Sequence, residues 1–418
     1  MKTLKKIAAA YNGVSLILRI AIGLVIGAIL ALVCPGATWL QELGNLFVGA
    51  LKGIAPVLVF VIVASALAQG TSKLDRRFGT VVWLYMLTTF LAAILSVVTS
   101  TIFPQTLVFP EAAKAEVIPQ GLGEVMHTLL ANIVSNPISA IMNGNYIGIL
   151  MWACLFGVAM KKLGADSTKV FLSNVSDAVS AIVRWIINLA PFGIMGLVFT
   201  NVVSNGLAIF TQYGKLLLLL VGTMLFMALI INPIIIFIYL RCNPYPLVFR
   251  CLRESGLTAF FTRSSAANIP VNMAMCEKFG LDKDFYSVSI PLGATINMDG
   301  AAITITIMTL AAANTLGMQV SLPAAILLSI MSALGACGAS GVAGGSLLLI
   351  PMACSLFGIS NDIAMQVVGV GFIIGVIQDS VETALNSAGD VEFAATAEYH
   401  QWLKDGKPLP EFLGGRKK

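Results

Sequence analysis

Long apolar stretches restrict the possible folds of this sequence more than any other feature. Several of them are about 20 residues long when their flanks are included, and they lie at residues 14–33, 57–68, 81–103, 216–240 and 367–377. An α-helix of that length crosses the roughly 30 Å hydrocarbon layer of a bilayer. Hydrophobic residues make up 58% of the 418 and charged residues only 11%, whereas a soluble domain of this length needs far more charge on its surface. We therefore expect an all-α polytopic membrane protein.

Basic residues gather between the apolar stretches and indicate the orientation of the chain. They cluster at residues 2–6, 73–77, 161–169 and 241–253, whereas the segment 104–125 carries three glutamates against one lysine. By the positive-inside rule, the basic clusters and both termini face the cytoplasm and the segment 104–125 is external. The alternation predicts six conventional spans, at roughly 13–33, 43–68, 79–103, 130–160, 170–204 and 208–240.

The residue types present argue against several kinds of chemistry. The seven cysteines form no CxxC pair, and the two histidines, His127 and His400, give little basis for a His-dependent metal site or triad. No GxxxxGK[ST] loop is present, which argues against direct use of ATP. The net charge of +5 follows from the basic inner loops and requires no nucleic-acid partner. We expect a protein that is not an enzyme.

Acidic residues without basic neighbours mark the last third of the chain. No lysine or arginine occurs between Lys283 and Lys404, yet this stretch carries Asp284, Asp299, Asp362, Asp379, Glu382, Asp390, Glu392 and Glu398. Carboxylates inside a bilayer are unfavourable unless they are protonated, paired or bound to a cation. Three solutions are open: protonation, cations from solution, or contact with upstream residues such as Arg263. The second is what a cation-coupled transporter requires.

Two polar or glycine-rich segments are predicted to be the tips of re-entrant helical hairpins. Residues 259–270 place Arg263, Ser264 and Ser265 in a moderately apolar region, and residues 334–345 carry a glycine at every third position. The apolar arms beside each tip have only about 12–18 residues, too few to span a bilayer. Non-helical backbone at membrane depth is tolerated where it lines a cavity or is buried in protein. Close helix packing of the GxxxG type uses a spacing of four and fits these glycines less well.

Two further segments carry polar residues within apolar helices. The segment 291–300 predicts a helix interrupted around Asn297–Gly300, whose freed carbonyl oxygens suit a hard cation such as sodium. In the last span, five polar side chains fall within an arc of about 100° on one helix face. They are Asp379, Glu382, Thr383, Asn386 and Asp390. This stripe predicts a binding site, although a face exposed to water at a subunit boundary is an alternative.

These motifs resemble the dicarboxylate/amino acid:cation symporter family. The resemblance rests on the RSS tip at 263–265, the GATINMDG sequence at 293–300, the glycine-rich second hairpin, and the D-x-x-x-T-x-x-N-x-x-x-D pattern at 379–390. It covers roughly residues 45–400 and implies eight transmembrane helices plus two re-entrant hairpins, a homotrimer, and an elevator-type movement. The implied divisions are 1–78 for scaffold helices 1 and 2, 79–125 for helix 3 and the external loop, 126–207 for scaffold helices 4 and 5, 208–245 for helix 6, 246–281 for hairpin 1, 282–318 for an unwound helix 7, 319–358 for hairpin 2, 359–403 for helix 8, and 404–418 for a cytoplasmic tail.

The resemblance also implies which residues bind substrate. They are Arg263, Ser264, Ser265, Ala301, Ala339, Asp379, Glu382, Thr383 and Asn386. In this assignment the Ser265 hydroxyl, the backbone of the first tip and Asn386 hold the substrate α-carboxylate. Asp379 holds the ammonium group.

Three sodium positions follow from the same resemblance. The first uses carbonyls of Gly293, Asn297 and Asn386 with the Asp390 carboxylate. The second uses Thr295, Met298 and carbonyls around Ala333, Leu334 and Ala336. The third uses Tyr85, Thr88, Thr89, Asn297 and Asp299. Sodium ions are thus the expected coupled ions.

Two departures from the family pattern bear on the substrate. Members that carry acidic amino acids have an arginine where this chain has Glu382, and usually a threonine where it has Ala301. A substrate carboxylate would meet a like charge at Glu382, whereas a small hydroxyl could donate a hydrogen bond to it. The sequence therefore favours sodium-driven import of serine, threonine or another small neutral amino acid across a bacterial inner membrane. Alternatives are a proton-coupled or acidic amino acid symporter of the same fold, an ion channel, and an intramembrane hydrolase.

Overall fold

The structure is a computed structural model that describes residues 14, 16–69, 76–108, 134–339 and 344–415. The described residues form helices joined by short connections, with no β-strand among them. Several parts of the sequence-based interpretation lie outside these residues, among them the start of the basic cluster at 73–77 and the start of the predicted span 130–160. The others are the basic N-terminal segment, most of the predicted external loop, residues 340–343 of the predicted second hairpin tip, and the last three residues.

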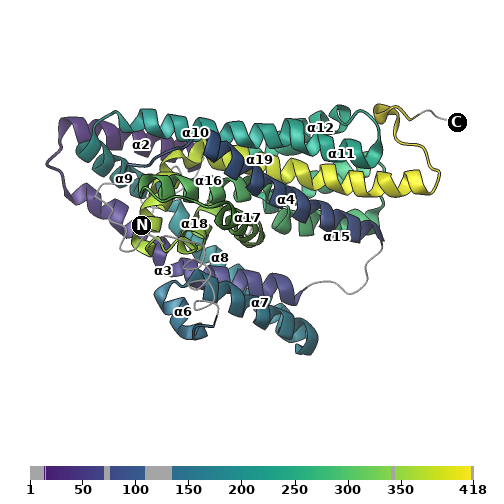
Figure 1. Cartoon of the computed structure of the whole chain (residues 1–418), viewed down its shortest axis with the longest axis horizontal. Coiled ribbons are helices and arrows are strands. Elements are labelled where there is room, and N and C mark those ends of the chain that lie inside the picture. The colour runs from purple at the N-terminus through teal and green to yellow at the C-terminus, as the bar shows by residue number, and fades with distance from the viewer. Residues whose placement is uncertain (1–13, 15, 70–75, 109–133, 340–343, 416–418) are drawn as a thin grey trace, which may run out of the picture.

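One group of helices forms the periphery of the molecule. It contains α2 (Leu16–Val33), α3 (Trp39–Ala68), α6 (Pro137–Asn143), α7 (Tyr146–Leu163), α8 (Asp166–Asn188) and α9 (Ala190–Asn205). Helix α2 packs along α9, and α3 packs against α7, α8 and α9. Figure 1 shows α3, α6, α7 and α8 on one side of the long helices that fill the rest of the molecule.

Glycines allow α2 and α9 to approach each other closely. A Cβ atom added at Gly23 would lie 2.2 Å from the backbone oxygen of Pro191. One added at Gly27 would lie 2.4 Å from the backbone oxygen of Met195. These two glycines are four residues apart on α2, which is the spacing by which small residues bring membrane helices into backbone contact. Larger side chains at these positions would separate the two helices.

The central group of helices surrounds α19, the longest helix in the structure. Its members are α4 (Arg76–Ile102), α10 (Ile209–Phe226), the π-turn η1 (Met227–Ile231), α11 (Asn232–Leu240), α15 (Lys283–Ile296), α16 (Asp299–Thr315), α17 (Leu322–Ala336), η3 (Ser346–Leu349), α18 (Ile350–Ser355) and α19 (Asn361–Lys404). Helix α19 contacts α4, α10, α11, α15, α16 and α18. Most of its side chains are buried although many are polar, so the centre of the molecule contains a polar site.

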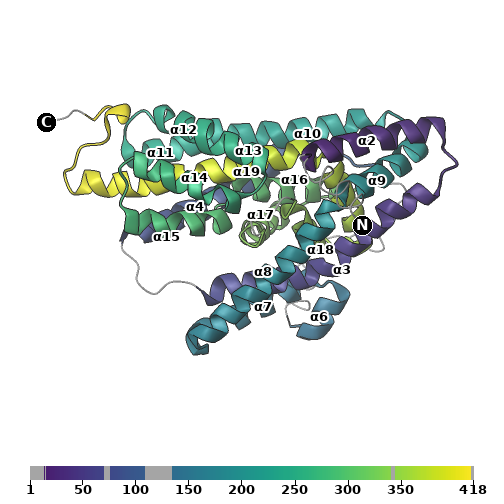
Figure 2. The same cartoon turned by 180° about the vertical axis from the view of Figure 1, so that it is seen from behind.

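Residues 245–278 form a helical hairpin beside α19. One arm is α12 (Tyr245–Cys251), the π-turn η2 (Leu252–Gly256) and α13 (Leu257–Thr262), and the other arm is α14 (Ser265–Lys278). The two arms pack against each other, and α13, η2 and α14 all contact α19. Figure 2 shows α12, α13 and α14 together on the face of the molecule opposite to that of Figure 1. The turn between the arms contains Arg263 and Ser264, two of the residues predicted to bind substrate.

The helix interruption predicted around Asn297 is present between α15 and α16. Helix α15 ends at Ile296, Asn297 and Met298 have non-helical backbone angles, and α16 begins at Asp299. Helix α16 is almost completely buried and packs against α4, α17, α18 and α19. The break therefore lies in the interior, where its free backbone groups face other protein elements.

Two of the predicted spans are wrong as single helices. The span 130–160 contains α6 and α7, because Gly144 adopts a left-handed conformation (φ 65°) that ends α6 and Asn145 caps the start of α7. The span 170–204 is divided into α8 and α9, which meet at Leu189 with Pro191 in the first turn of α9. A proline in a first helical turn leaves no N–H group unsatisfied and favours a helix start.

Six described helices or helix pairs are long and apolar enough to cross a bilayer. They are α3, α4, α8, the run α10–α11, the pair α15–α16, and α19. Shorter apolar helices include α2, α9, α17 and the η3–α18 segment. The chain thus has the helices of a multi-pass membrane protein.

Candidate functional site

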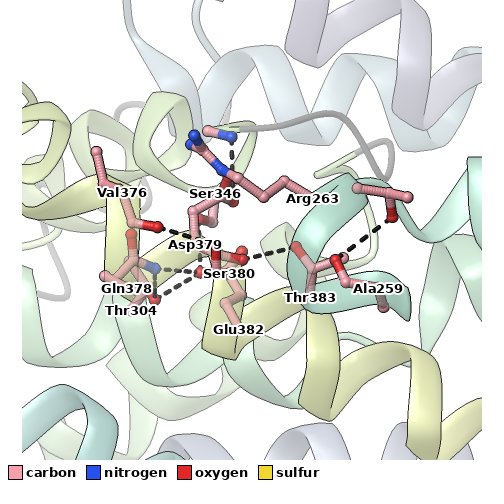
Figure 3. Close-up of polar contacts among 12 residues, drawn as sticks. Ala259, Arg263, Thr304, Ser346, Val376, Gln378, Asp379, Ser380, Glu382 and Thr383 are labelled. Carbon is pink, nitrogen blue, oxygen red and sulfur yellow. Dashed lines mark hydrogen bonds and ion pairs between the residues drawn. The ribbon is translucent and has the colours of Figure 1, made fainter. Parts of the chain in front are cut away.

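The tip of the first hairpin is joined to α19 by a buried ion pair. The Arg263 Nε atom lies 2.6 Å from Oδ2 of Asp379, and the two side chains are 7% and 3% exposed. The other carboxylate oxygen of Asp379 accepts a hydrogen bond from the backbone N–H of Gly344, 3.2 Å away. Figure 3 shows the arginine reaching across from the hairpin to the aspartate on α19. Asp379 is therefore contacted by the tip of the first hairpin and by the backbone at Gly344, in the segment predicted to form the second hairpin.

Local backbone geometry directs Arg263 toward this site. Arg263 ends α13 in a left-handed conformation (φ 51°), and its N–H donates to the Ala259 carbonyl at 2.8 Å. This conformation is unfavourable for a residue with a Cβ atom, by roughly 1–2 kcal/mol. Ser264 then caps α14, because its hydroxyl oxygen accepts a hydrogen bond from the Ala267 N–H at 3.2 Å. The reversal brings Arg263 and Ser265 into the interior, with 6% and 2% exposure.

Glu382 belongs to a separate hydrogen-bond network one turn further along α19. Its Oε2 atom accepts hydrogen bonds from the hydroxyls of Thr304 (2.6 Å) and Ser346 (2.9 Å) and from the Gln378 amide (2.5 Å). The Gln378 amide also donates to the Thr304 hydroxyl at 2.7 Å. Elements α16, η3 and α19 thus converge on one carboxylate oxygen (Figure 3). Among the described residues, no ion pair neutralises this buried glutamate.

Three other predicted substrate residues, Thr383, Ala301 and Ala339, are also buried. The Thr383 hydroxyl donates to the Asp379 backbone carbonyl at 2.7 Å, so it is bonded within its own helix. Ala301 is fully buried in the first turn of α16, and Ala339 is 6% exposed three residues beyond the end of α17. The two alanines offer no polar side-chain group to a ligand, and the Thr383 hydroxyl is bonded within its own helix.

Asn386 is directed toward the break between α15 and α16. Its Oδ1 atom accepts a hydrogen bond from the Gly300 N–H at 2.7 Å, and its Nδ2 atom lies 3.4 Å from the Met298 sulfur. The sequence predicts that this amide holds the substrate carboxylate. In the structure it instead satisfies a free N–H group at the start of α16. An amide that also bound substrate would have to share or exchange this hydrogen bond.

The predicted residues of the first sodium position come together around Asp390. The Asn297 amide donates to Oδ1 of Asp390 at 3.1 Å and to the Asn386 carbonyl at 3.0 Å. A Cβ atom at Gly293 would lie 2.8 Å from Oδ1 of Asp390 and 2.9 Å from the Tyr85 hydroxyl, so only glycine fits there without a shift. Asp390 is fully buried, and no basic side chain pairs with it among the described residues.

The predicted residues of the third sodium position lie together around Asp299. Oδ1 of Asp299 accepts a hydrogen bond from the Thr89 hydroxyl at 3.2 Å, and Thr88 lies 3.5 Å from Oδ1 of Asn297. Tyr85 lies one turn away on α4 and donates to the Asp390 backbone carbonyl at 3.0 Å. The five residues of this set are all fully buried. Their oxygen atoms are the donor type that hard cations prefer.

The residues predicted for the second sodium position have fewer contacts with one another than those of the first and third positions. The Thr295 hydroxyl donates to the Leu292 carbonyl of its own helix at 2.7 Å, and Leu334 is 54% exposed. The sulfur of Cys337 lies 3.3 Å from the Ala333 carbonyl and 3.5 Å from the Ile296 carbonyl. This cysteine connects the end of α17 to the end of α15. Ala336 is buried beside it, while Met298 donates its N–H to the Thr89 hydroxyl at 3.2 Å.

Several residues of the site were not predicted from the sequence. They are Asn232, Asn272, Thr304, Ser346 and Gln378. Gln378 lies 100° from Asp379 around α19 and so falls outside the polar arc, although its spacing of four from Glu382 is a usable signal. Thr304 and Ser346 approach Glu382 from distant segments, and no local pattern indicates that.

Comparisons with known proteins agree with the motifs. The model of the sodium:dicarboxylate symporter family matches residues 16–399. A protein of Bifidobacterium adolescentis named serine/threonine transporter SstT is 74% identical to this chain over 416 residues, covering 100% of this chain and 97% of the relative. Proteins of the same name from Streptococcus agalactiae and Streptococcus thermophilus are 60% and 56% identical, covering 94% and 96% of this chain and 98% and 100% of the relatives. The chain belongs to the sodium:dicarboxylate symporter family.

Proposed function

We propose that this protein is a secondary active symporter that imports serine, threonine and similar small neutral amino acids with sodium. The names of its close relatives support this substrate class, and the family description supports sodium coupling. The structural observation on which the proposal chiefly rests is the pair of buried acids Asp379 and Glu382, for which Arg263 is the one cationic partner among the described residues. Two negative charges against one positive charge suit a substrate with an ammonium group and no acidic side chain.

Asp379 is the proposed partner of the substrate ammonium group. Its carboxylate is already paired with Arg263, so the ammonium would compete with the guanidinium for the same oxygens. Charge-assisted hydrogen bonds of this kind are about twice as strong as neutral ones. The exchange of one cation for another keeps Asp379 neutralised throughout binding.

Glu382 is the proposed selectivity residue. The hydrogen bonds that reach it from described residues all end on Oε2, and Oε1 remains for a donor such as a substrate hydroxyl. An acidic substrate would bring a second carboxylate to a buried carboxylate, and like charges in such surroundings repel strongly. This arrangement favours serine and threonine over aspartate and glutamate.

Sodium ions are the proposed counterions of Asp299 and Asp390. Both carboxylates are fully buried, and neither has a basic partner among the described residues. Carbonyl and carboxylate oxygens surround both positions, and buried charge is strongly unfavourable unless it is compensated. Sodium binding at these acids would tighten the helix break that contacts Asn386 and the substrate region. Substrate movement would then depend on the sodium gradient.

Membership of the family also supports a proposal for the architecture of the whole transporter. We propose eight transmembrane helices and two re-entrant hairpins, in a homotrimer whose central helix group moves against the peripheral group. We place it in a bacterial inner membrane with both termini in the cytoplasm, on the strength of the basic clusters. In this scheme the protein is a carrier without catalytic residues.

Uptake by purified protein in liposomes tests the proposal. Labelled serine should accumulate under an inward sodium gradient, and an inward proton gradient without sodium should not replace it. Excess threonine should compete with the label and excess aspartate should not. Accumulation driven by the proton gradient alone would favour the proton-coupled alternative, and strong competition by aspartate would contradict the role of Glu382.

A further inference from the structure

A buried cluster of four polar side chains joins the first hairpin to α19. Ser255 comes from η2, Asn268 and Asn272 from α14, and Ser387 from α19. All four are essentially inaccessible, with 0% exposure. They surround neither Asp379 nor Glu382, and the proposed function leaves them without a role.

A π-turn in the first arm of the hairpin creates the first contact of the cluster. In the π-turn at residues 252–256, backbone hydrogen bonds join residues five apart instead of the usual four. This spacing leaves backbone carbonyls in the turn available to other donors. The Asn268 amide donates to the Ser255 carbonyl at 3.2 Å and to the Ser255 hydroxyl at 3.0 Å. The two arms of the hairpin are therefore held together by a polar side chain deep in the interior.

The same amides extend the cluster to α19. Asn268 donates to the Ser387 hydroxyl at 2.7 Å, and Asn272 donates to the hydroxyl and the carbonyl of Ser387, both at 3.1 Å. Ser387 lies three residues before Asp390, less than one helical turn away. Buried polar contacts of this kind fix one relative position of two helices more strictly than apolar packing does.

Asn272 also reaches the Asp390 carboxylate itself. Its Nδ2 atom lies 3.5 Å from Oδ2 of Asp390, while the Asn297 amide lies 3.1 Å from Oδ1. One oxygen is thus approached from the hairpin and the other from the helix break. The hairpin arm that carries Asn272 also carries Ser265 at its start, in the turn that contacts Asp379 through Arg263.

We propose that Asn272 is a positioning residue for the Asp390 carboxylate, and that Ser387 holds Asn272 in place for this task. The inference rests on the proposed sodium coupling. Through these contacts the orientation of the cation-binding carboxylate depends on how the first hairpin sits against α19. Sodium affinity then responds to the position of the same hairpin whose tip contacts the substrate site.

Sodium titrations of serine uptake test this role in liposomes that contain full-length protein. Asn272→Leu keeps the side-chain volume and removes the donor, and Ser387→Ala removes the hydroxyl that both asparagines contact. We expect the sodium concentration for half-maximal uptake to rise about tenfold in the first variant and about threefold in the second. Thr306→Val is the matched control, because Thr306 is fully buried on α16 and its hydroxyl has no partner among the described residues.

Measuring the half-maximal sodium concentration and the maximal uptake rate separately distinguishes a residue that positions Asp390 from one that only stabilises the fold. A variant that is merely less stable contains fewer active molecules, so its maximal rate falls while its half-maximal sodium concentration stays at the wild-type value. Unchanged half-maximal sodium concentrations in both variants would therefore overturn the proposal, whatever happens to the rates. Because Ser387→Ala is a small change, it provides the readout if Asn272→Leu does not fold. Failure of the proposed function itself would be visible separately, as sodium-independent uptake by the wild-type protein.

Discussion

The Nε atom of Arg263 and the Oδ2 atom of Asp379 lie 2.6 Å apart in the interior of the protein. One residue belongs to the tip of the first hairpin and the other to the central helix α19. In the proposed function a substrate ammonium group at Asp379 competes with the guanidinium for the carboxylate, which links substrate binding to a change at the hairpin tip. The predictions below follow from this relationship and from the acids around it.

Replacing Arg263 with alanine should destabilise the protein most strongly in the absence of substrate. The change leaves Asp379 buried without its counterion, which costs about 3–5 kcal/mol for a buried pair. Serine with sodium should restore part of the loss, because its ammonium group replaces the guanidinium. Thermal unfolding with and without both ligands measures this, and serine should raise Tm more in the variant than in the wild type.

Arg241→Ala is the matched control for this experiment. Arg241 also ends a helix in a left-handed conformation (φ 54°), but its side chain is exposed and forms no ion pair with the described residues. Arg241→Ala replaces an arginine at the same left-handed backbone conformation but breaks no buried ion pair. An equal rise of Tm with serine in all three proteins would show that the ammonium group does not take the place of Arg263.

Asp379→Asn should abolish serine uptake while the protein remains folded. The ammonium group loses its charged partner, and Arg263 is left as an unpaired buried cation. We expect a loss of uptake of about 100-fold or more, since removal of a charged hydrogen-bond partner costs roughly 2–3 kcal/mol. Asp284→Asn, which neutralises an exposed acid in the first turn of α15, should transport normally. Size-exclusion profiles check the fold of both, and normal uptake by the Asp379 variant would disprove its assignment.

Glu382→Gln should weaken the discrimination against acidic amino acids. Glutamine keeps an oxygen that can accept the hydrogen bonds of Thr304 and Ser346, but it removes the negative charge. Aspartate should then inhibit serine uptake about tenfold more effectively than in the wild type. Glu254→Gln, on the half-exposed outer side of the first hairpin, is the control for loss of a glutamate. If inhibition by aspartate is the same in the variant and the wild type, charge at Glu382 does not set selectivity.

Gly293→Ala should impair sodium-dependent transport, because the added methyl group would lie 2.8 Å from the Asp390 carboxylate and 2.9 Å from the Tyr85 hydroxyl. Overpacking of this kind costs about 1–3 kcal/mol and would displace the carboxylate. Gly375→Ala is a control on α19, where no atom lies within 4 Å of the added Cβ. Uptake measured against sodium concentration should show a higher half-maximal value only in the first variant. Equal curves would place the cation away from Asp390.

Much of the candidate site could be predicted because its residues follow local rules. The helix interruption at Asn297 and Met298 is signalled by Asn, Asp and Gly inside an apolar run, and the polar stripe of α19 follows from helical periodicity. The absence of lysine and arginine from 284 to 403 likewise indicates acids that need a partner from elsewhere, and upstream residues supply it for Asp379 (Arg263) and for Glu398 (Arg77). These features depend on residues that are close in sequence.

The remaining features depend on contacts between distant segments. The pairing of Arg263 with Asp379 spans 116 residues, and the approach of Thr304 to Glu382 spans 78. Asn386 shows the same limitation, since its position on the stripe is predictable but its hydrogen bond to the Gly300 N–H is not. The division of the predicted span 170–204 into two helices at Leu189 could not be predicted from the sequence either, because Pro191 is compatible with a kinked helix and with a new helix start.

The dependence of serine affinity on sodium tests the central claim most directly. Serine binding to the detergent-purified protein can be titrated in sodium chloride and in potassium chloride of equal ionic strength. We predict that sodium tightens serine binding at least about tenfold, because cations at the buried acids Asp299 and Asp390 stabilise the helix break beside the substrate site. Equal serine affinity in the two salts would contradict sodium coupling.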